Sequence, residues 1–453
     1  MNEGERRSVQ NCMQKSERNS EQGAIQGNIS EYVGVSQQER EAAAILKEIE
    51  GWQAEARAIR QTLHQHPELG FEESGTRAKV VELLTNYGVD QIDLSFAKTA
   101  VIATIEGNGE GPMIGLRADM DALPIEEQNQ FSHRSEYPGV MHACGHDGHT
   151  TMLLMAAKYL AKHRNFSGRV ILIFQPAEEG RGGAEQLVVK ENFLARYPLD
   201  AIYAMHNWPT LPAGTFAIKP GSIMASSDRI FITIKGVSGH AGMPHLTQDP
   251  LLVATHIYQG IQGLVARTVD PLSPIVVAIT QIHGGETTNA IAGQASMAGT
   301  IRTHDEKLRH KILAQLQCLV ESMGRAFGME ATMRLGPISH PVTVSSESEA
   351  RRAVAVARAL VGPERVKLDI ERQMTSEDFA FYLERVPGCY LFIGNGGAYE
   401  DEGGGLIGLH HSRYDFNDEI TPLGASFLVR LVTSYTNEVS SEISSEISSA
   451  ILS

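Results

Sequence analysis

Short, uninterrupted apolar runs constrain the fold of this chain more than any other feature. One is the segment VILIF at residues 170–174, and similar runs occur in PMIGLRADMDALP and DAIYAMHNWP. Stretches with apolar residues at helical spacing, such as HTTMLLMAAKYLAKHR, separate them. Such runs are typical of strands buried on both faces of a parallel sheet, with helices as crossovers. The pattern predicts an α/β main domain with a mixed, largely parallel sheet.

The pattern changes near residue 226. DRIFITIKGVSG alternates apolar and polar residues, as a sheet with one solvated face would. The helical stretch LLVATHIYQGIQGLVAR, the strands PIVVAITQIHGG and QASMAGTIRT, and the helix EKLRHKILAQLQCLVESMGRAFG follow. This β-α-β-β-α order predicts an α+β domain at residues 226–336. It would be inserted into a discontinuous main domain made of residues 37–225 and 337–437.

Both ends of the chain are polar. Residues 1–36 are rich in Glu, Gln, Asn and Ser, which predicts a disordered extension. Residues 438–453 contain an SSEI repeat and are of low complexity. We expect no chemistry from either end.

The overall charge limits the classes of binding partner, and the cysteine spacing indicates the cellular compartment. The 453 residues carry 54 acidic and 39 basic side chains, a net charge of -15, so no basic surplus attracts nucleic acid or an anionic membrane. No apolar run approaches the ~20 residues of a membrane span, and the N-terminal residues do not resemble a signal peptide. The four cysteines are widely spaced, so we expect reduced thiols and a cytoplasmic protein.

Residues that commonly bind metals gather in five segments at expected strand ends or loop starts. They are RADMD at 117–121, CGHDGH at 144–149, QPAEEG at 175–180, MHN at 205–207 and LHHS at 409–412. Each alone is compatible with a solvated turn, an exposed acidic loop or a packed histidine. Together they favour one site at the carboxyl ends of the strands. Thiolates and imidazoles suit zinc, cobalt and similar divalent ions.

Nine motifs in order resemble one known family, and they span about residues 40–437. They are GLRADMDALP, MHACGHDGHTTML, FQPAEEGRGGA, MHNWP, SGHAGMPH, GGETTNAIA, GTIRT, SEDFAFY and LHHSRYDFND. The chain resembles the hippurate hydrolase and auxin-conjugate (IAA-amino acid) hydrolase family of dinuclear-metal amidohydrolases. Aminoacylase and carboxypeptidase G are relatives. The resemblance implies a metallopeptidase main domain and an inserted dimerisation or lid domain.

The same resemblance implies two divalent metal ions per subunit, manganese, zinc or cobalt. The implied ligands are Cys144, His146, Glu179, His206 and His411. The family reads Leu-His-Ser before its last ligand, whereas this chain reads Leu-His-His-Ser, so His410 competes with His411. We select His411 because it directly precedes the serine. His149 is expected to orient a ligand or to pack, and Asp147 to cap the following helix or to orient a ligand.

The resemblance also implies roles outside the ligand set. Glu178 would be the general base, and Asp121 would orient the site. His240 would donate to the oxyanion, and in dimeric relatives this histidine comes from the other subunit, which implies a homodimer. Asn289 and Arg302 would receive the free carboxylate of the substrate, which the planar guanidinium suits.

The predicted activity is hydrolysis of the amide bond of small N-acyl-amino acids. Acetyl, hippurate-like and indole-acetyl groups remain open as the acyl part. A related dinuclear-metal carboxypeptidase or dipeptidase is the first alternative. An inactive metal-binding relative and a structural zinc module are further alternatives, but a structural site has four closed ligands and no spare glutamate.

Overall fold

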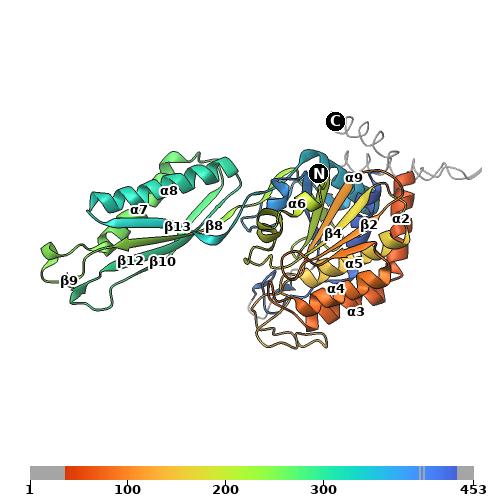
Figure 1. Cartoon of the computed structure of the whole chain (residues 1–453), viewed down its shortest axis with the longest axis horizontal. Helices are drawn as coiled ribbons and strands as arrows, with labels where there is room; N and C mark the ends of the chain where they lie inside the picture. The colour runs from red at the N-terminus through yellow and green to blue at the C-terminus, as the bar shows by residue number, and fades with distance from the viewer. Residues whose placement is uncertain (1–35, 397–398, 401–403, 436–453) are drawn as a thin grey trace, which may run out of the picture. The chain divides into compact units, whose positions relative to one another are not determined.

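The computed structural model describes residues 36–396, 399–400 and 404–435 (Figure 1). The tail expected at residues 438–453 and all but the last residue of the extension expected at 1–36 lie outside the described residues. The described residues from Glu41 onward form one compact unit. Within these ranges, every helix is too short or too polar to cross a membrane.

An eight-stranded sheet forms the core, in the order β1-β2-β4-β3-β5-β16-β6-β15. Its strands are β1 (Gln91–Asp93), β2 (Val101–Glu106), β3 (Met113–Asp119), β4 (Arg169–Gln175), β5 (Ala201–Trp208), β6 (Phe216–Ala217), β15 (Val366–Lys367) and β16 (Gly388–Gly394). β3 runs parallel to both β4 and β5, and β16 runs parallel to β5. β1, β2 and β6 form the antiparallel pairs. This confirms the predicted mixed, largely parallel sheet.

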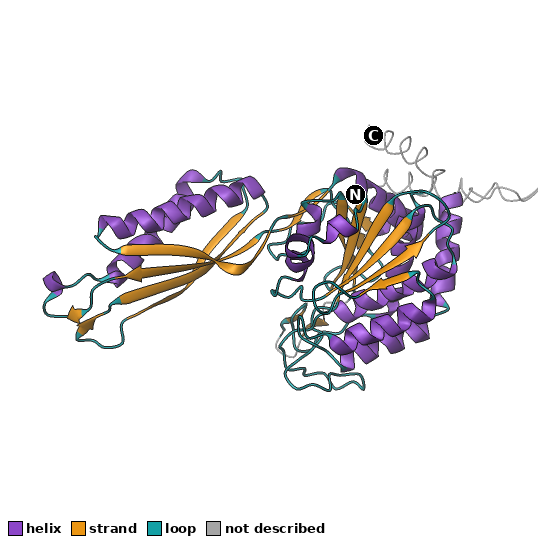
Figure 2. Cartoon of the chain, viewed as in Figure 1, coloured by secondary structure: helices purple, strands orange, loops and turns teal. Residues whose placement is uncertain are grey.

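Apolar cores lie on both faces of this sheet. Helices pack beside its strands (Figure 2). In β4, Val170, Leu172 and Phe174 enter one core, while Ile171 and Ile173 enter the other, which explains the uninterrupted apolar run. The first core is covered by α2 (Gln37–Glu50), α3 (Gln53–Gln65), α4 (Ser74–Tyr87), α5 (His146–Lys162), α9 (Glu347–Val361) and α11 (Thr421–Thr433). The second is covered by the π-helical turn η1 (Glu185–Lys190) and by α6 (Phe193–Arg196) and α10 (Ala380–Leu383).

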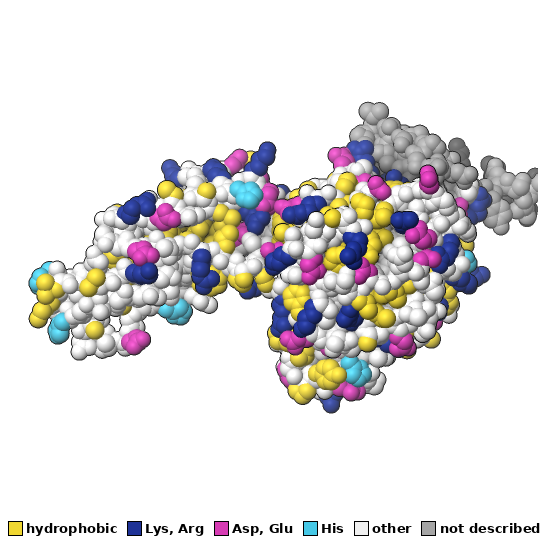
Figure 3. Space-filling model, viewed as in Figure 1, with side chains coloured by type: hydrophobic (Ala, Val, Ile, Leu, Met, Phe, Trp, Pro, Cys, Tyr) yellow, Lys and Arg dark blue, Asp and Glu magenta, His cyan; other side chains and the backbone are white. Residues whose placement is uncertain are grey.

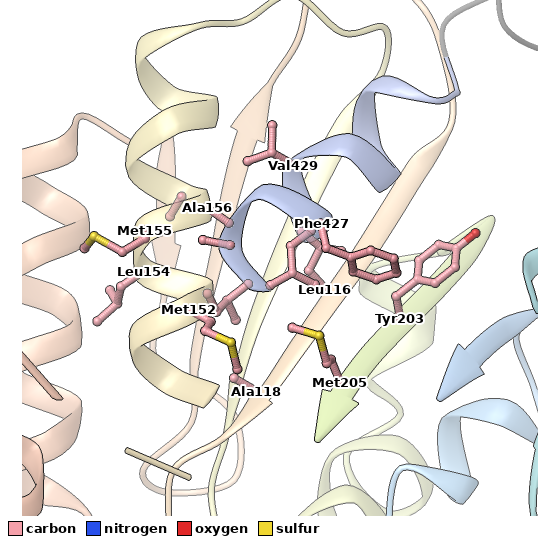
Figure 4. Packing of buried hydrophobic residues seen from close by; sticks show 14 of the residues in the cluster. Leu116, Ala118, Met152, Leu154, Met155, Ala156, Tyr203, Met205, Phe427 and Val429 are labelled. Atoms are coloured by element: carbon pink, nitrogen blue, oxygen red, sulfur yellow. The ribbon is translucent and has the colours of Figure 1, made fainter. Parts of the chain in front are cut away.

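Helix α5 is the central helix of the first core (Figure 4). Its Met152 and Ala156 pack with Phe427 of α11 and with residues of β3 and β5. A side chain at Gly424 of α11 would meet the Met152 sulfur at 2.1 Å, so a glycine there permits the close helix contact. This packing holds the N-terminus of α5 at the site described below.

A second, antiparallel sheet has the order β10-β12-β8-β13. Its strands are β8 (Ser227–Lys235), β10 (Ile275–Gly284), β12 (Gln294–Thr303) and β13 (Glu330–His340), and it packs on α7 (Pro250–Thr268) and α8 (Glu306–Ala326). Ile230, Ile232 and Ile234 alternate into this core as the sequence pattern indicates. The observed order contains the predicted β-α-β-β-α, and β13 follows it as an additional strand.

Short elements complete the described chain. The two-stranded pairs are β7 (Gly221–Met224) with β14 (Thr343–Ser345), β9 (Gly239–His240) with β11 (Ala290–Ile291), and β17 (Tyr399–Glu400) with β18 (Leu406–Ile407). The 3-10 turns are η2 (Pro244–Leu246), η3 (Pro363–Arg365) and η4 (Asp418–Ile420). On the surface seen in Figure 3, acidic and basic side chains are interspersed.

Candidate metal centre

The segments singled out in the sequence meet at one edge of the eight-stranded sheet. β3 lies between β4 and β5 and runs parallel to both, so the carboxyl ends of the three strands adjoin. Asp119 ends β3, the loop with Glu178 follows β4, and His206 lies near the end of β5. Helix α5 begins at His146 beside them. Ligands of open α/β sheets bind at this edge.

Cys144, His146 and His206 form the first ligand group. One donor atom from each lies within 4.8 Å of the others, and Cys144 Sγ is 3.4 Å from His206 Nε2. His146 Nδ1 donates to the carbonyl oxygen of Asp121 at 2.9 Å, and His206 Nδ1 donates to that of Asn207 at 2.7 Å. Because a carbonyl only accepts, Nδ1 is the donor in each ring, and Nε2 is the atom that can face a metal, as in metal-binding histidines.

A buried atom that has no hydrogen bond within the described part of the chain marks the same place, and Asp119 Oδ2 lies 3.8 Å from it. His146 Nε2 is buried and has no hydrogen-bond partner among the described residues. Buried polar atoms in proteins are almost always paired. A bound cation would satisfy this nitrogen.

The second ligand group contains His410, so its geometry favours His410 over His411, the ligand selected from the sequence. Cys144, Glu179 and His410 each place a donor atom within 4.8 Å of the other two, and His410 Nε2 is 3.0 Å from Glu179 Oε1. His411 Nδ1 accepts from the Arg413 amide at 3.0 Å. His410 has a left-handed backbone with φ 64°, and neighbouring rings in such a turn point in different directions. We therefore replace His411 with His410 in the candidate set.

The electrostatics of the cluster favour a cation. Burial raises the pKa of the Cys144 thiol well above its usual value, and the carboxylates of Glu179 and Glu178 raise it further. Burial and the neighbouring His149 hold the pKa of His206 well below its usual value, so this imidazole stays neutral. Burial lowers the pKa of His146, but the carboxylates of Asp119, Asp121 and Glu179 together outweigh burial, and the net pKa rises to about 10. A thiol, imidazoles and carboxylates around one point fit a divalent transition metal.

Asp121 connects the ligands to one another. Its Oδ2 accepts from the Glu179 amide at 2.8 Å, and its Oδ1 lies 3.3 Å from His146 Nδ1. The carboxylate therefore fixes the backbone of one candidate ligand and the ring of another. This geometry supports the orienting role expected of Asp121.

His149 bridges two groups beneath the cluster. Its Nδ1 lies 2.6 Å from Asp119 Oδ1, and its Nε2 lies 2.6 Å from Asn207 Oδ1. A side chain at Gly145 would meet that same Asn207 oxygen at 2.4 Å, and Gly145 has φ 93°, so a glycine is required there. His149 thus holds the base of the site.

Asp147 does not cap helix α5, because it lies within the first turn and Gly145 is the N-cap residue. Its Oδ2 is 2.8 Å from His64 Nδ1 and 3.6 Å from Arg60 Nη1, both on α3. Asp147 therefore joins α5 to α3 from inside the protein.

Glu178 stands among acids that sequence reasoning did not select. Its Oε1 accepts from the amide of Asp378 at 3.3 Å, and donor atoms of Glu178, Glu377 and Asp378 lie within 4.8 Å of one another. Buried Arg117 pairs with Asp119 at 2.6 Å, Asp378 at 2.8 Å and Glu377 at 3.0 Å. Burial, then Glu377, raises the pKa of Glu178 well above its usual value. Arg117 lies in the apolar strand β3, and a buried arginine needs acidic partners, so the sequence did contain a signal for these acids.

Comparison with known proteins identifies the family. Residues 115–434 match the model of peptidase family M20/M25/M40. The chain belongs to this family. It is 35% identical to hippurate hydrolase of Campylobacter jejuni over 86% of this chain and 99% of that protein. It is 34% identical to thermostable carboxypeptidase 2 of Saccharolobus solfataricus over 87% and 98% of the two chains.

A solved structure from the same family has a similar fold. A dinuclear metal binding peptidase from the M20 family of Bacillus subtilis is 33% identical, with a TM-score of 0.72 over 85% of this chain and 98% of that chain. These findings confirm the family resemblance and the fold class read from the sequence. The chain is thus a metal-dependent amide hydrolase of the M20 family.

A cavity of about 190 Å³ opens onto the candidate centre of this M20 hydrolase. Donor residues at its base are Cys144, Glu178, Glu179, His206 and His410. Trp208, Met224 and Leu409 contribute apolar walls. Within the described residues, no Lys or Arg side chain lines the cavity.

The remaining candidates lie in the segment of the second sheet. His240 is exposed, pairs with Ala290 between β9 and β11, and accepts from the Gly242 amide at 3.0 Å. Asn289 accepts the Ala241 amide through its carbonyl at 3.0 Å, so it lies beside His240. Arg302 lies in β12, where burial and then Arg229 lower its pKa.

Proposed function

We propose that this M20-family enzyme hydrolyses the amide bond between an acyl group and an amino acid, with Glu178 as general base. One observation carries the proposal. Two ligand groups share Cys144, and the spare carboxylate of Glu178 opens into the same cavity. A structural metal site has no use for such a carboxylate.

The candidate donors fit a pair of divalent ions, manganese, zinc or cobalt. They are Cys144, His146, Glu179, His206 and His410. When bound, such ions lower the pKa of a water molecule and polarise the substrate carbonyl.

Glu178 is suited to proton transfer by its surroundings. The amide of Asp378 holds one carboxylate oxygen, and the acids that face Glu178 favour a bound proton. Glu178 would take a proton from water and deliver it to the leaving amine, work that typically accelerates a reaction ~10²–10⁴-fold. Asp121 would keep Glu179 and His146 in place during the reaction.

Substrate recognition would be divided between two parts of the chain. The cavity at the centre has apolar walls at Trp208, Met224 and Leu409, which suit an uncharged acyl group, and no Lys or Arg among the described residues lines it to pair with a carboxylate. The free carboxylate of the substrate would go to Asn289 and Arg302. His240 would donate to the oxyanion across a homodimer interface.

We place this activity in the cytoplasm. The three described cysteines, Cys144, Cys318 and Cys389, form no disulfide with one another, and Cys144 is needed as a thiolate ligand. A reducing compartment preserves that thiol.

A carboxypeptidase is the second candidate, favoured by the similarity to thermostable carboxypeptidase 2. Both candidates cleave the bond before a C-terminal amino acid, so the group on the acyl side separates them. Metal-stripped protein is resupplied with manganese, zinc or cobalt. It is then offered acetyl-, benzoyl- and indole-acetyl-amino acids beside tripeptides with the same last residue.

The expected result is hydrolysis of at least one N-acyl-amino acid about tenfold faster in kcat/KM than any tripeptide. Faster cleavage of the tripeptides identifies a carboxypeptidase instead. The Glu178→Gln protein is the control for hydrolysis by the added metal alone.

A further inference from the structure

The loop between α3 and α4, residues 66–73, carries a buried carboxylate that the reaction above does not use. Glu73 is fully buried. Its Oε1 accepts from the Ala177 amide at 2.9 Å, and its Oε2 accepts from Thr99 Oγ1 at 2.6 Å. Among the described residues, no Lys, Arg or His forms an ion pair with it, and burial raises its pKa to about 7. A buried acid without a cation costs stability, so packing alone does not account for it.

The partner of Glu73 is the residue directly before the proposed base. Ala177 has a left-handed backbone with φ 60°, which is uncommon for a residue with a side chain. The Gly183 amide donates to the Ala177 carbonyl at 3.0 Å and closes the turn that carries Glu178 and Glu179. The bond from Ala177 to Glu73 favours this strained conformation, which sets the direction of Glu178.

The same loop also supports the segment that follows Asp121. The carbonyl of Glu68 accepts from the Ala122 amide at 2.8 Å, and Leu69 forms a β-bridge with Ala122. Gly70 packs on Ala177 so closely that a side chain there would meet Ala177 Cα at 2.9 Å. One short loop therefore touches both segments that carry the acids of the site.

We propose that Glu73 is a positioning residue that aligns Glu178 for proton transfer through the Ala177 amide. The proposal rests on the assignment of Glu178 as general base. Glu73 belongs to no candidate ligand group among the described residues and does not line the cavity at the centre. Its action is the hydrogen bond that holds the turn at Ala177.

Two substitutions of Glu73 distinguish the effect of its side-chain length from the effect of its charge. In Glu73→Gln the amide oxygen still accepts from Ala177 and the amide nitrogen donates to Thr99, so both contacts persist without the charge. In Glu73→Asp the charge persists, but the side chain is one methylene shorter and falls short of Ala177. The metal-loaded proteins are compared in kcat, KM, metal content and melting temperature.

The Gln variant should keep kcat within about threefold of wild type. The Asp variant should lose about 10²-fold in kcat, because a misplacement of ~1 Å has an effect of this size. Its KM should stay within about threefold, and its metal content should equal that of the wild type. Glu72→Gln is the matched control, since Glu72 is an exposed neighbour that pairs only with Arg181, at 3.1 Å, among the described residues, and its kcat should not change.

Three outcomes contradict the proposal. Wild-type kcat in Glu73→Asp shows that the contact is dispensable. A loss of kcat in Glu73→Gln together with wild-type kcat in Glu73→Asp shows that the charge of residue 73 matters and the length of its side chain does not. If kcat falls in both variants in proportion to their melting temperatures, Glu73 has a purely structural role.

If Glu73→Asp does not fold, Thr99→Val decides the question. It removes the hydroxyl that fixes Glu73, and kcat should fall about tenfold at constant KM; wild-type kcat there refutes the proposal. All variants are assayed on the fastest substrate of the wild type. A wild type that cleaves only peptides contradicts the proposed acyl substrate, while the comparison of variants still tests Glu73.

Discussion

Cys144 is the residue on which the candidate centre converges. It belongs to both ligand groups, one with His146 and His206 and one with Glu179 and His410. Burial opposes ionisation of its thiol, so the thiolate form depends on a bound cation. Two predictions follow from the division of work between this ligand and the neighbouring carboxylates.

The substitution Glu178→Gln should abolish turnover while metal content remains near that of the wild type. The amide cannot take a proton from water, and only Glu179 of the adjacent pair is needed as a ligand. Steady-state rates and elemental analysis of the same sample check this. Glu179→Gln is the control and should lose metal. Full activity of Glu178→Gln eliminates Glu178 as the base.

The substitution Cys144→Ala should lower metal occupancy at low free metal, because a methyl group cannot replace a thiolate ligand. Elemental analysis after dialysis measures the stoichiometry. Cys389→Ala is a suitable control, since Cys389 is also buried and its sulfur lies against the Tyr390 carbonyl at 3.7 Å. Unchanged stoichiometry in Cys144→Ala refutes the ligand assignment.

At the scale of elements, buried ion pairs fix α5 in the orientation that presents His146. Arg60 of α3 is almost fully buried and pairs with Asp418 at 2.7 Å, Asp415 at 2.9 Å and Asp147 at 3.6 Å. It thus ties α3 both to α5 and to the segment before α11.

The substitution Arg60→Met should lower the free energy of unfolding by about 3–5 kcal/mol, because it removes the buried guanidinium from Asp418, Asp415 and Asp147. Urea unfolding followed by circular dichroism gives the value. Arg57→Met is the matched control on the same helix, since Arg57 is half exposed and its ion pairs contribute about 0–1 kcal/mol. Equal effects of the two substitutions would show that the buried network adds nothing.

For the whole molecule, the open question is whether a site is completed by a second copy of the chain. His240 is exposed, and its ring accepts a hydrogen bond from its own loop. The family resemblance assigns it a role in the partner's site. Whether His240 acts in a partner's site can be tested with dimers that combine two different inactive subunits.

Mixing His240→Ala with Glu178→Gln should restore activity up to about one quarter of wild type in a random one-to-one mixture. In a mixed dimer, one site then has both groups and the other has neither, and half of the dimers are mixed. Native mass spectrometry verifies subunit exchange. If mixed dimers form and no activity returns, His240 serves its own subunit or has no catalytic role.

The sequence determined the features whose causes are local. The run VILIF is apolar throughout because both faces of β4 are buried, so this strand and a largely parallel sheet could be predicted. Cys144 and His146 are two residues apart at one helix start, and Glu178 adjoins Glu179. Residues so close in sequence stay close in any fold, which is why their motifs could predict that they share one site.

The tertiary structure was needed to distinguish adjacent residues of the same type. It was also needed to find contacts between residues far apart in the sequence. His410 and His411 offer the same imidazole, and the left-handed turn at His410 selects which ring reaches Glu179. Glu178 meets the Asp378 amide across 200 residues, and no spacing in the sequence encodes that contact. Glu73 likewise meets Ala177 only because the loop before α4 and the loop after β4 pack together. Such contacts arise from the packing of elements, and packing exists only in three dimensions.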